Sequence, residues 1–206
     1  MAAIIGLAPA MASQAQVATW VSDPVGTWME VSFKHSNLYE VTVTAPNMIA
    51  TVAFNGDDLT AAHFEISAAA DSMWSHNNLF DGAMMSELFF NVKQHPSVYF
   101  SSKRIMRDVD TYRVLGDLTA NGVTRPTEFR MTASKIVPWE GTAFRAFTLT
   151  ATIDGKDFGM TFKNPDGLKN DPLFGDKLNV KFTVEVTDKP NASKFTPPPT
   201  RDPFTG

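Results

Sequence analysis

Alternation of apolar and polar side chains is the dominant pattern of this 206-residue chain between residues 20 and 187. The clearest case is residues 178–186, LNVKFTVEV, in which every second side chain is apolar and those between are polar or charged. Successive side chains of a β-strand point to opposite faces, so this segment predicts a strand with one dry face and one wet face. The same period appears in residues 29–35, 64–68, 98–103, 112–118, 128–133 and 147–153, and less regularly in 38–44 and 48–54.

One interval departs from this period. Residues 77–92, NNLFDGAMMSELFFNV, space their apolar side chains loosely like a short helix, with Gly82 as a weak point. His95-Pro96 follows, and the residue before a proline favours an extended backbone. We therefore expect a helix or helical turn here, which leads into the next strand and covers one end of the structure that the strands form.

Eight or nine short, half-polar strands cannot all lie in one flat sheet without leaving unpaired backbone groups along its edges. Closure into a barrel removes those edges. The prediction is therefore an all-β fold, an antiparallel, lipocalin-like β-barrel of about eight strands with a short helix capping one mouth. A barrel of this size is either filled by its own side chains or holds one slim ligand, and the pattern does not distinguish the two.

A turn signal joins two of the expected strands. Residues 116–126, GDLTANGVTRP, lie between the alternating segments 111–118 and 127–136. Asn-Gly favours the positive φ angles of a tight hairpin turn, and Pro126 marks the entry to the next strand. The sequence thus predicts a hairpin whose turn is at Asn121 and Gly122.

Composition restricts the chemistry of the chain. The formal net charge is −4 without a basic stripe, which argues against nucleic acid as a partner. Cysteine is absent, so neither disulfides nor thiol chemistry is expected. The 16 Phe and 10 Met against 3 Tyr give a soft apolar surface that could repack around an oily guest, although an ordinary core would use the same residues.

The two ends of the chain differ from its middle. Residues 1–15 hold an apolar stretch too short to span a bilayer, followed by small residues that fit a cleavage site, but no basic start. We predict a signal-peptide-like leader or a disordered N-terminus over residues 1–19 and a barrel domain over residues 20–188. Residues 189–206 contain three consecutive prolines and predict a disordered, extended tail.

Six segments, in order, resemble the YceI-like family. They are residues 20–24 (WVSDP), 31–35 (VSFKH), 81–92 (with its FF pair), 95–102 (HPSVYFSS), 116–126 (GDLTANGVTRP) and 153–160 (IDGKDFGM). The resemblance implies a secreted or periplasmic bacterial β-barrel that holds an isoprenoid-like lipid. It also implies that the inward apolar side chains form the wall of a lumen. The residues expected there are Met29, Val31, Phe33, Phe64, Phe89, Phe90, Phe100, Phe129, Met131, Phe147, Phe158 and Phe182.

Catalytic motifs with suitable spacing are missing from the sequence, including the nucleophile elbow, the zinc-protease helix and the phosphate-cradling glycine loop. Four scattered histidines do not suggest a metal site, and His35 reads as structural. We expect no enzyme activity, catalytic residue, metal or cofactor other than a bound lipid. The expected partner is an apolar lipid, with no nucleic acid and no transmembrane span, and a homodimer is left open. The alternative function is a structural or stress-related barrel that acts through protein contacts without a ligand.

Overall fold

The computed structural model of the protein describes residues 17–36, 38–160 and 174–189. The helical elements of these residues are η1 (Ala70–Ser72), α1 (Asn78–Met85) and η2 (Gly155–Phe158). The strands are β1 (Ala18–Ser22), β2 (Trp28–His35), β3 (Tyr39–Ala45), β4 (Met48–Asn55), β5 (Asp58–Ala69), β6 (Ser97–Arg107), β7 (Tyr112–Ala120), β8 (Val123–Ala133), β9 (Val137–Trp139), β10 (Thr142–Asp154) and β11 (Phe174–Thr187).

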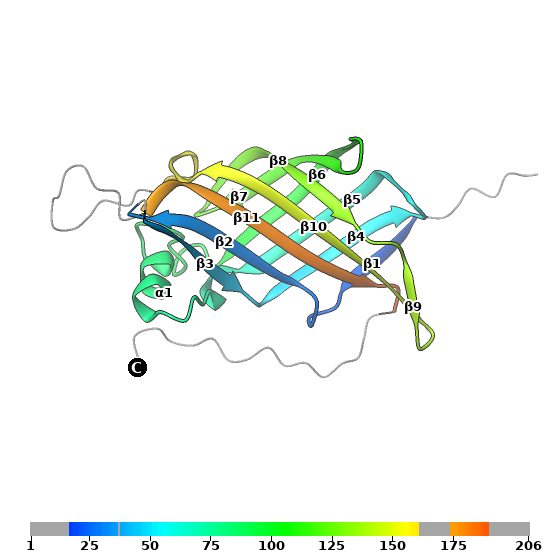
Figure 1. Cartoon of the computed structure of the whole chain (residues 1–206), viewed down its shortest axis with the longest axis horizontal. Helices are drawn as coiled ribbons and strands as arrows, with labels where there is room; N and C mark the ends of the chain where they lie inside the picture. The colour runs from blue at the N-terminus through cyan, green and yellow to red at the C-terminus, as the bar shows by residue number, and fades with distance from the viewer. Residues whose placement is uncertain (1–16, 37, 161–173, 190–206) are drawn as a thin grey trace, which may run out of the picture.

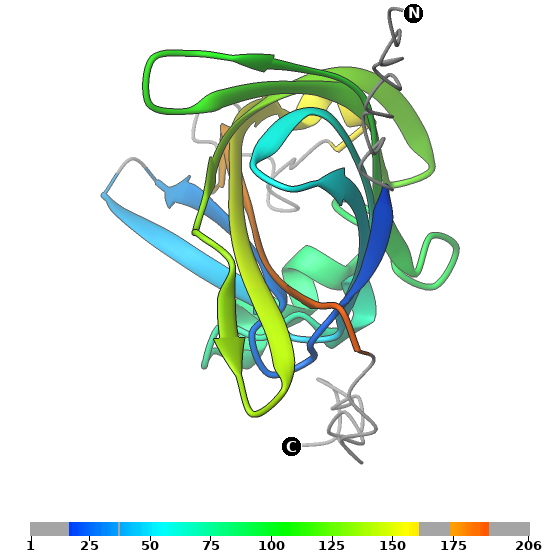
Figure 2. The same cartoon turned by 90° about the vertical axis from the view of Figure 1, so that its right-hand side faces the viewer.

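The described strands form one antiparallel sheet that closes on itself (Figures 1 and 2). Its order is β3-β2-β11-β1-β4-β5-β6-β7-β8-β10-β9, and an additional pairing of β10 with β11 closes a ring of eight strands. The β2–β3 hairpin extends the sheet from β11, and β9 extends it from β10. The predicted antiparallel barrel is confirmed. Strands β1 and β9 were not predicted, because five and three residues are too short for a clear alternation.

The ring is closed by one long pairing and one short one. Strand β10 pairs with β11 over eleven consecutive residue pairs, from Phe144 opposite Thr187 to Asp154 opposite Lys177. On its other edge β11 pairs first with β2 and then, through Thr187 and Val186, with β1. Strand β1 also pairs with β4, so this short strand joins the last strand of the chain to the fourth.

The predicted hairpin turn is present between β7 and β8. Asn121 and Gly122 have φ angles of 47° and 70°, the left-handed values that a two-residue turn of this kind requires. The amide Nδ2 of Asn121 donates to the carbonyl oxygen of Phe158 at 3.1 Å. The turn is thereby held against η2, which follows β10.

Helix α1 lies at one end of the barrel, on the left in Figure 1. The side chain of Asn77 caps its N-terminus by accepting from the Leu79 amide at 3.0 Å. The helix ends at Met85 because Ser86 takes an extended backbone, and its hydroxyl donates to the Ala83 carbonyl at 2.7 Å. The helix is shorter than the interval 77–92, and its place at one mouth agrees with the prediction.

The predicted leader and tail fall mostly outside the described residues, which exclude 1–16 and 190–206. Strand β1 begins at Ala18 and β11 ends at Thr187. Within the described ranges, none of the helices has the length and apolar character needed to cross a membrane. The leader, the tail and the domain limits remain predictions.

Glu185 of β11 should make the stability of the fold depend on pH. Burial raises the pKa of this carboxyl, and the negative charge of Asp23 raises it further. The folded state then holds the proton more tightly than the unfolded chain, so stability falls as pH rises above the ordinary carboxyl value near 4.5. We expect Glu185→Gln to be more stable than the wild type in urea unfolding at pH 7, with the difference shrinking as pH falls toward 4.5 and absent below about pH 4.

Glu128→Gln is the matched control. The hydrogen bond from Arg113 lowers the pKa of the Glu128 carboxyl, so its removal should not stabilise the fold at neutral pH. If the difference in unfolding free energy between Glu185→Gln and the wild type is the same at pH 4 and at pH 7, the surroundings of Glu185 do not raise its pKa.

Candidate functional site

All twelve side chains that the sequence suggested for a lumen wall are buried. Each of the twelve is at most 3% exposed. Nine lie on the inward faces of β2, β5, β6, β8, β10 and β11. Phe89 and Phe90 follow α1, and Phe158 belongs to η2. Burial is common to all twelve, and their place on a lumen wall and their role in binding a ligand stay predictions.

Three phenylalanine rings meet in the middle of the barrel. The ring centroids of Phe100 and Phe129 are 4.7 Å apart, those of Phe129 and Phe182 are 5.3 Å apart, and those of Phe100 and Phe182 are 6.2 Å apart. All three side chains, and Phe64, have an exposed fraction of 0%. A water-sized sphere therefore does not fit beside these rings, and the interior is filled by side chains at this level.

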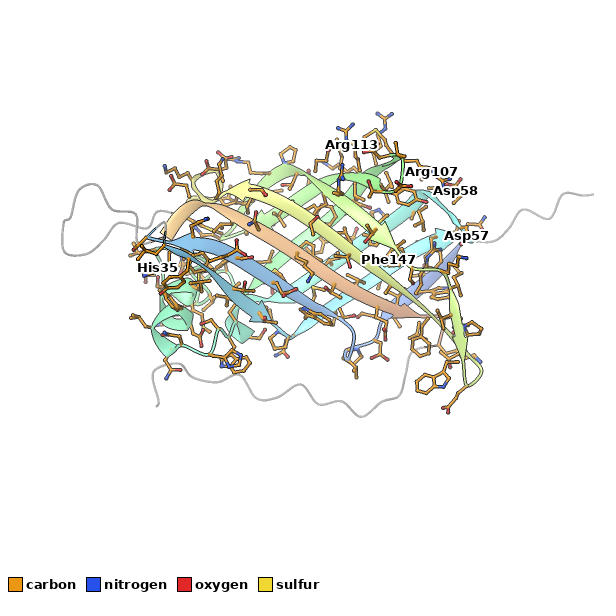
Figure 3. All side chains as sticks on the ribbon, viewed as in Figure 1. His35, Asp57, Asp58, Arg107, Arg113 and Phe147 are labelled. Carbon is orange, nitrogen blue, oxygen red and sulfur yellow. The ribbon has the colours of Figure 1, made fainter. Side chains whose placement is uncertain are left out.

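At the α1 end, rings of the barrel contact the segment that covers the mouth. The ring centroids of Phe33 of β2 and Phe89 are 6.2 Å apart, and those of Phe89 and Phe90 are 5.4 Å apart. His35, labelled near α1 in Figure 3, lies 5.2 Å from the ring of Phe80 and packs against it edge-on. These contacts agree with a structural role for His35 and close this mouth with aromatic side chains.

At the opposite end, the structure adds two aromatic residues that sequence reasoning missed. Trp20 of β1 packs on Phe54 of β4 at 5.0 Å, and Phe54 packs on Phe147 at 5.9 Å. Phe147 in turn meets Phe64 edge-on at 5.0 Å. The signal for Phe54 was present, because it has the same parity as Ala50 and Val52 in the alternating segment 48–54. The aromatic lining therefore continues to this end of the barrel.

Arg145 of β10 is a third buried residue that sequence reasoning missed. It is 5% exposed and has the inward parity of Phe147 and Leu149. Its Nη1 donates to the Gly56 carbonyl at 2.7 Å and its Nε to the Ser134 carbonyl at 3.1 Å. Burial lowers its pKa, which the charge of Asp57 partly offsets. Extending the alternation of residues 147–153 back by two positions would have placed this cation on the inward face.

A polar cluster outside the lumen joins β5 to β6. His63 Nε2 lies 2.6 Å from Glu65 Oε1, and Ser101 Oγ donates to the same carboxylate oxygen at 2.7 Å. Ser102 Oγ lies 3.4 Å from His63 Nδ1, but it is 3% exposed and accepts from the Phe64 amide at 2.9 Å. This serine is held between the strands, so the cluster stabilises strand pairing.

A groove of about 390 Å³ lies on the outer wall, where β2, β3, β10 and β11 meet. Four of its polar side chains form two pairs. Lys181 Nζ lies 2.5 Å from Glu30 Oε2, and Thr152 Oγ1 donates to Asn179 at 2.8 Å. Among the described residues, no group of three or more histidine and acidic side chains is placed to hold a metal ion. The interior is therefore the stronger candidate for a site.

Comparisons with known proteins agree with this geometry. The model of the YceI-like domain matches residues 20–186. A UPF0312 protein of Pectobacterium atrosepticum is 28% identical over 156 residues, which cover 74% of this chain and 81% of that protein. A UPF0312 protein of Pseudomonas putida is 29% identical over 161 residues, covering 76% of this chain and 83% of that protein.

Solved structures share the fold at low sequence identity. Burkholderia cenocepacia BcnA superposes with a TM-score of 0.67 at 16% identity, over 80% of this chain and 98% of BcnA. The Campylobacter jejuni YceI protein gives 0.61 at 21% identity, over 76% of this chain and 90% of its own. A third structure is a domain from Saccharophagus degradans that is described as polyisoprenoid binding and implicated in plant cell wall breakdown. It superposes with a TM-score of 0.61 at 11% identity, over 83% of this chain and 98% of that domain.

Proposed function

This chain belongs to the YceI-like domain family, and on that premise we propose that it binds a long apolar lipid of the isoprenoid type inside its barrel, as a periplasmic carrier or store. The observation that supports the proposal is the single apolar core of the described residues, whose aromatic rings include Trp20 and Phe54 at one end and Phe89 and Phe90 at the other. The polyisoprenoid-binding domain of Saccharophagus degradans, which has the same fold, supports the class of ligand.

Burial alone would hold such a guest. Each methylene transferred from water to an apolar interior contributes about 0.8 kcal/mol, so a long chain binds without a charged contact along its length. The rings of Phe64, Phe100, Phe129 and Phe182 now fill the middle of the barrel. A guest must therefore replace ring–ring contacts with ring–guest contacts, which unbranched and aromatic side chains allow by rotating.

The close packing favours a second candidate function. A barrel whose interior side chains exclude water is stable without a ligand, as a structural or stress-related protein that acts through its outer surface. The two candidates differ in one measurable property, because only the carrier contains lipid when it is isolated from its own cells.

Native mass spectrometry of protein purified from its own host, without detergent, tests the proposal. We expect a species heavier than the bare chain, whose extra mass is extracted by organic solvent and fragments as an isoprenoid lipid. Met131→Gln introduces an amide at a fully buried inward position and should lower the lipid-bound fraction. The control Ile49→Gln lies at a position 70% exposed and should leave that fraction unchanged.

Wild-type protein that carries no lipid, and takes up none from host lipid extract, would favour the structural barrel. The proposed periplasmic location is supported by the leader-like residues 1–15 and by membership of the YceI-like family. N-terminal sequencing of the periplasmic fraction should find a chain that begins near Ala15.

A further inference from the structure

Arg145 is the one buried charged residue within a strand in the parts of the chain that the structure describes. The other two buried charged residues there lie elsewhere, Asp23 in a loop and Asp81 in α1. Asp81 is satisfied, because its Oδ1 accepts from the Ser75 amide at 2.7 Å and from the Ser75 hydroxyl at 2.5 Å. The inward-facing strand residues therefore carry one positive charge against many aromatic rings.

The hydrogen-bonding capacity of this guanidinium is only partly used. A guanidinium has five N–H donors, and the bonds to Gly56 and Ser134 occupy two of them. The Nη2 nitrogen lies 3.6 Å from Asp57 Oδ1, beyond hydrogen-bonding distance, and the side chain of Asp57 is 90% exposed. A carboxylate so open to water compensates a buried cation weakly.

The rings beside Arg145 belong to the lumen. Its guanidinium carbon lies 5.2 Å from the ring centroid of Phe54 and 5.5 Å from that of Phe147. The ring of Phe147 also contacts the ring of Phe64, which is fully buried. Figure 3 shows Asp57 at the tip of the barrel opposite His35, with Phe147 between that tip and the middle. The cation thus lies where the aromatic lumen meets one end of the barrel.

We propose that Arg145 binds an anionic head group, a phosphate or a carboxylate, of the lipid whose apolar tail lies among the phenylalanine rings. This inference rests on the proposed lipid-binding function and adds the chemistry and orientation of the guest. An oxyanion has two oxygens that match the free donors of a guanidinium, and such charge-assisted pairs are the strongest hydrogen bonds in proteins. A neutral head group, such as an alcohol, leaves the buried charge without a close counterion.

Pairs of ligands with the same tail test the proposal. We would measure binding of farnesyl phosphate against farnesol, and of hexadecanoate against hexadecanol, by equilibrium dialysis into delipidated full-length protein. The wild type should bind the anionic member about tenfold to a hundredfold more tightly. The farnesyl pair measures the preference for a phosphate head group, and the hexadecyl pair measures the preference for a carboxylate. The pair with the larger ratio of anion affinity to alcohol affinity therefore identifies the preferred head group.

Three variants connect the preference to the residue. Arg145→Met should reduce the ratio of affinities to near one while the binding of farnesol is retained. Asp57→Asn should raise the ratio, because it removes the carboxylate that competes for the guanidinium. Arg113→Met is the matched control at an arginine side chain that is 50% exposed and should leave the ratio unchanged.

The outcomes separate this inference from the function on which it rests. Equal affinity of the wild type for both members of each pair would overturn the role of Arg145 and leave lipid binding intact. Binding of neither member would overturn both proposals. If Arg145→Met does not fold, Arg145→Lys replaces it, and a ratio below that of the wild type supports the proposal while an unchanged ratio contradicts it.

Discussion

Phe129→Asp should lower the free energy of unfolding of the lipid-free protein by about 4 kcal/mol or more at pH 7. Phe129 is fully buried, and its ring contacts Phe100 and Phe182. A carboxylate at this position finds neither water nor a partner, so the folded state holds it protonated. Its folded pKa is therefore raised, and the destabilisation should decrease as pH falls from 7 toward the ordinary aspartate value near 4, below which only the cost of a buried neutral carboxyl remains. Urea unfolding at pH 7 and pH 3.5 measures both effects.

The matched control is Phe129→Leu, which keeps the site apolar and should cost about 1 kcal/mol with no dependence on pH. An aspartate variant that unfolds at nearly the wild-type urea concentration would contradict the filled interior. It would mean that water enters the barrel beside Phe129, and that the lumen is hollow without its lipid.

Gly116→Ala is expected to cost about 3 kcal/mol. Gly116 lies on the inward face of β7, and the ring of Phe100 on β6 packs directly over it. A Cβ atom there would lie 2.3 Å from the Ser101 carbonyl oxygen and 2.7 Å from two ring carbons of Phe100. Neither backbone nor a ring fixed among other rings can move away cheaply, so strands β6 and β7 must separate locally. Thermal and urea unfolding measure the loss.

Gly56→Ala provides the comparison for this glycine. Gly56 has a φ angle of 55°, so alanine is strained there, but nothing lies within 4 Å of the added Cβ. The expected cost is about 1 kcal/mol, from the left-handed backbone alone. If Gly116→Ala loses no more stability than Gly56→Ala, the Ser101 carbonyl and the Phe100 ring move away from the added methyl group at little cost, which contradicts the close packing at position 116.

The strands and the turn were within reach of sequence reasoning. The two-residue period identified nine strand segments, because the alternation reports directly which face of a strand is dry. The Asn121-Gly122 turn was also recognisable, since few residue pairs accept two positive φ angles. Strand β9 was not recognised, because its three residues all remain exposed and give no alternation.

The candidate site was only partly predictable. The twelve expected wall residues are all buried, and for the nine that lie on strands this follows because parity within a strand identifies inward side chains. Trp20 lies on a five-residue strand whose pairing with β4 supplies its neighbour Phe54, and no local pattern announces that pairing. Arg145 was overlooked for a different reason, because a charged side chain is usually exposed, although its parity with Phe147 places it on the inward face.

By itself, the sequence determined the inward and outward faces of the strands, the position of the hairpin turn and the aromatic character of the interior. Those properties depend on neighbours within a few residues, through side-chain alternation and the φ angles that each residue accepts. Only the tertiary structure decided that β11 closes the ring on β10, that the phenylalanine rings exclude water, and that Arg145 meets Gly56 and Ser134 at one end. These depend on strand register and on partners up to 89 residues away, which local patterning does not encode.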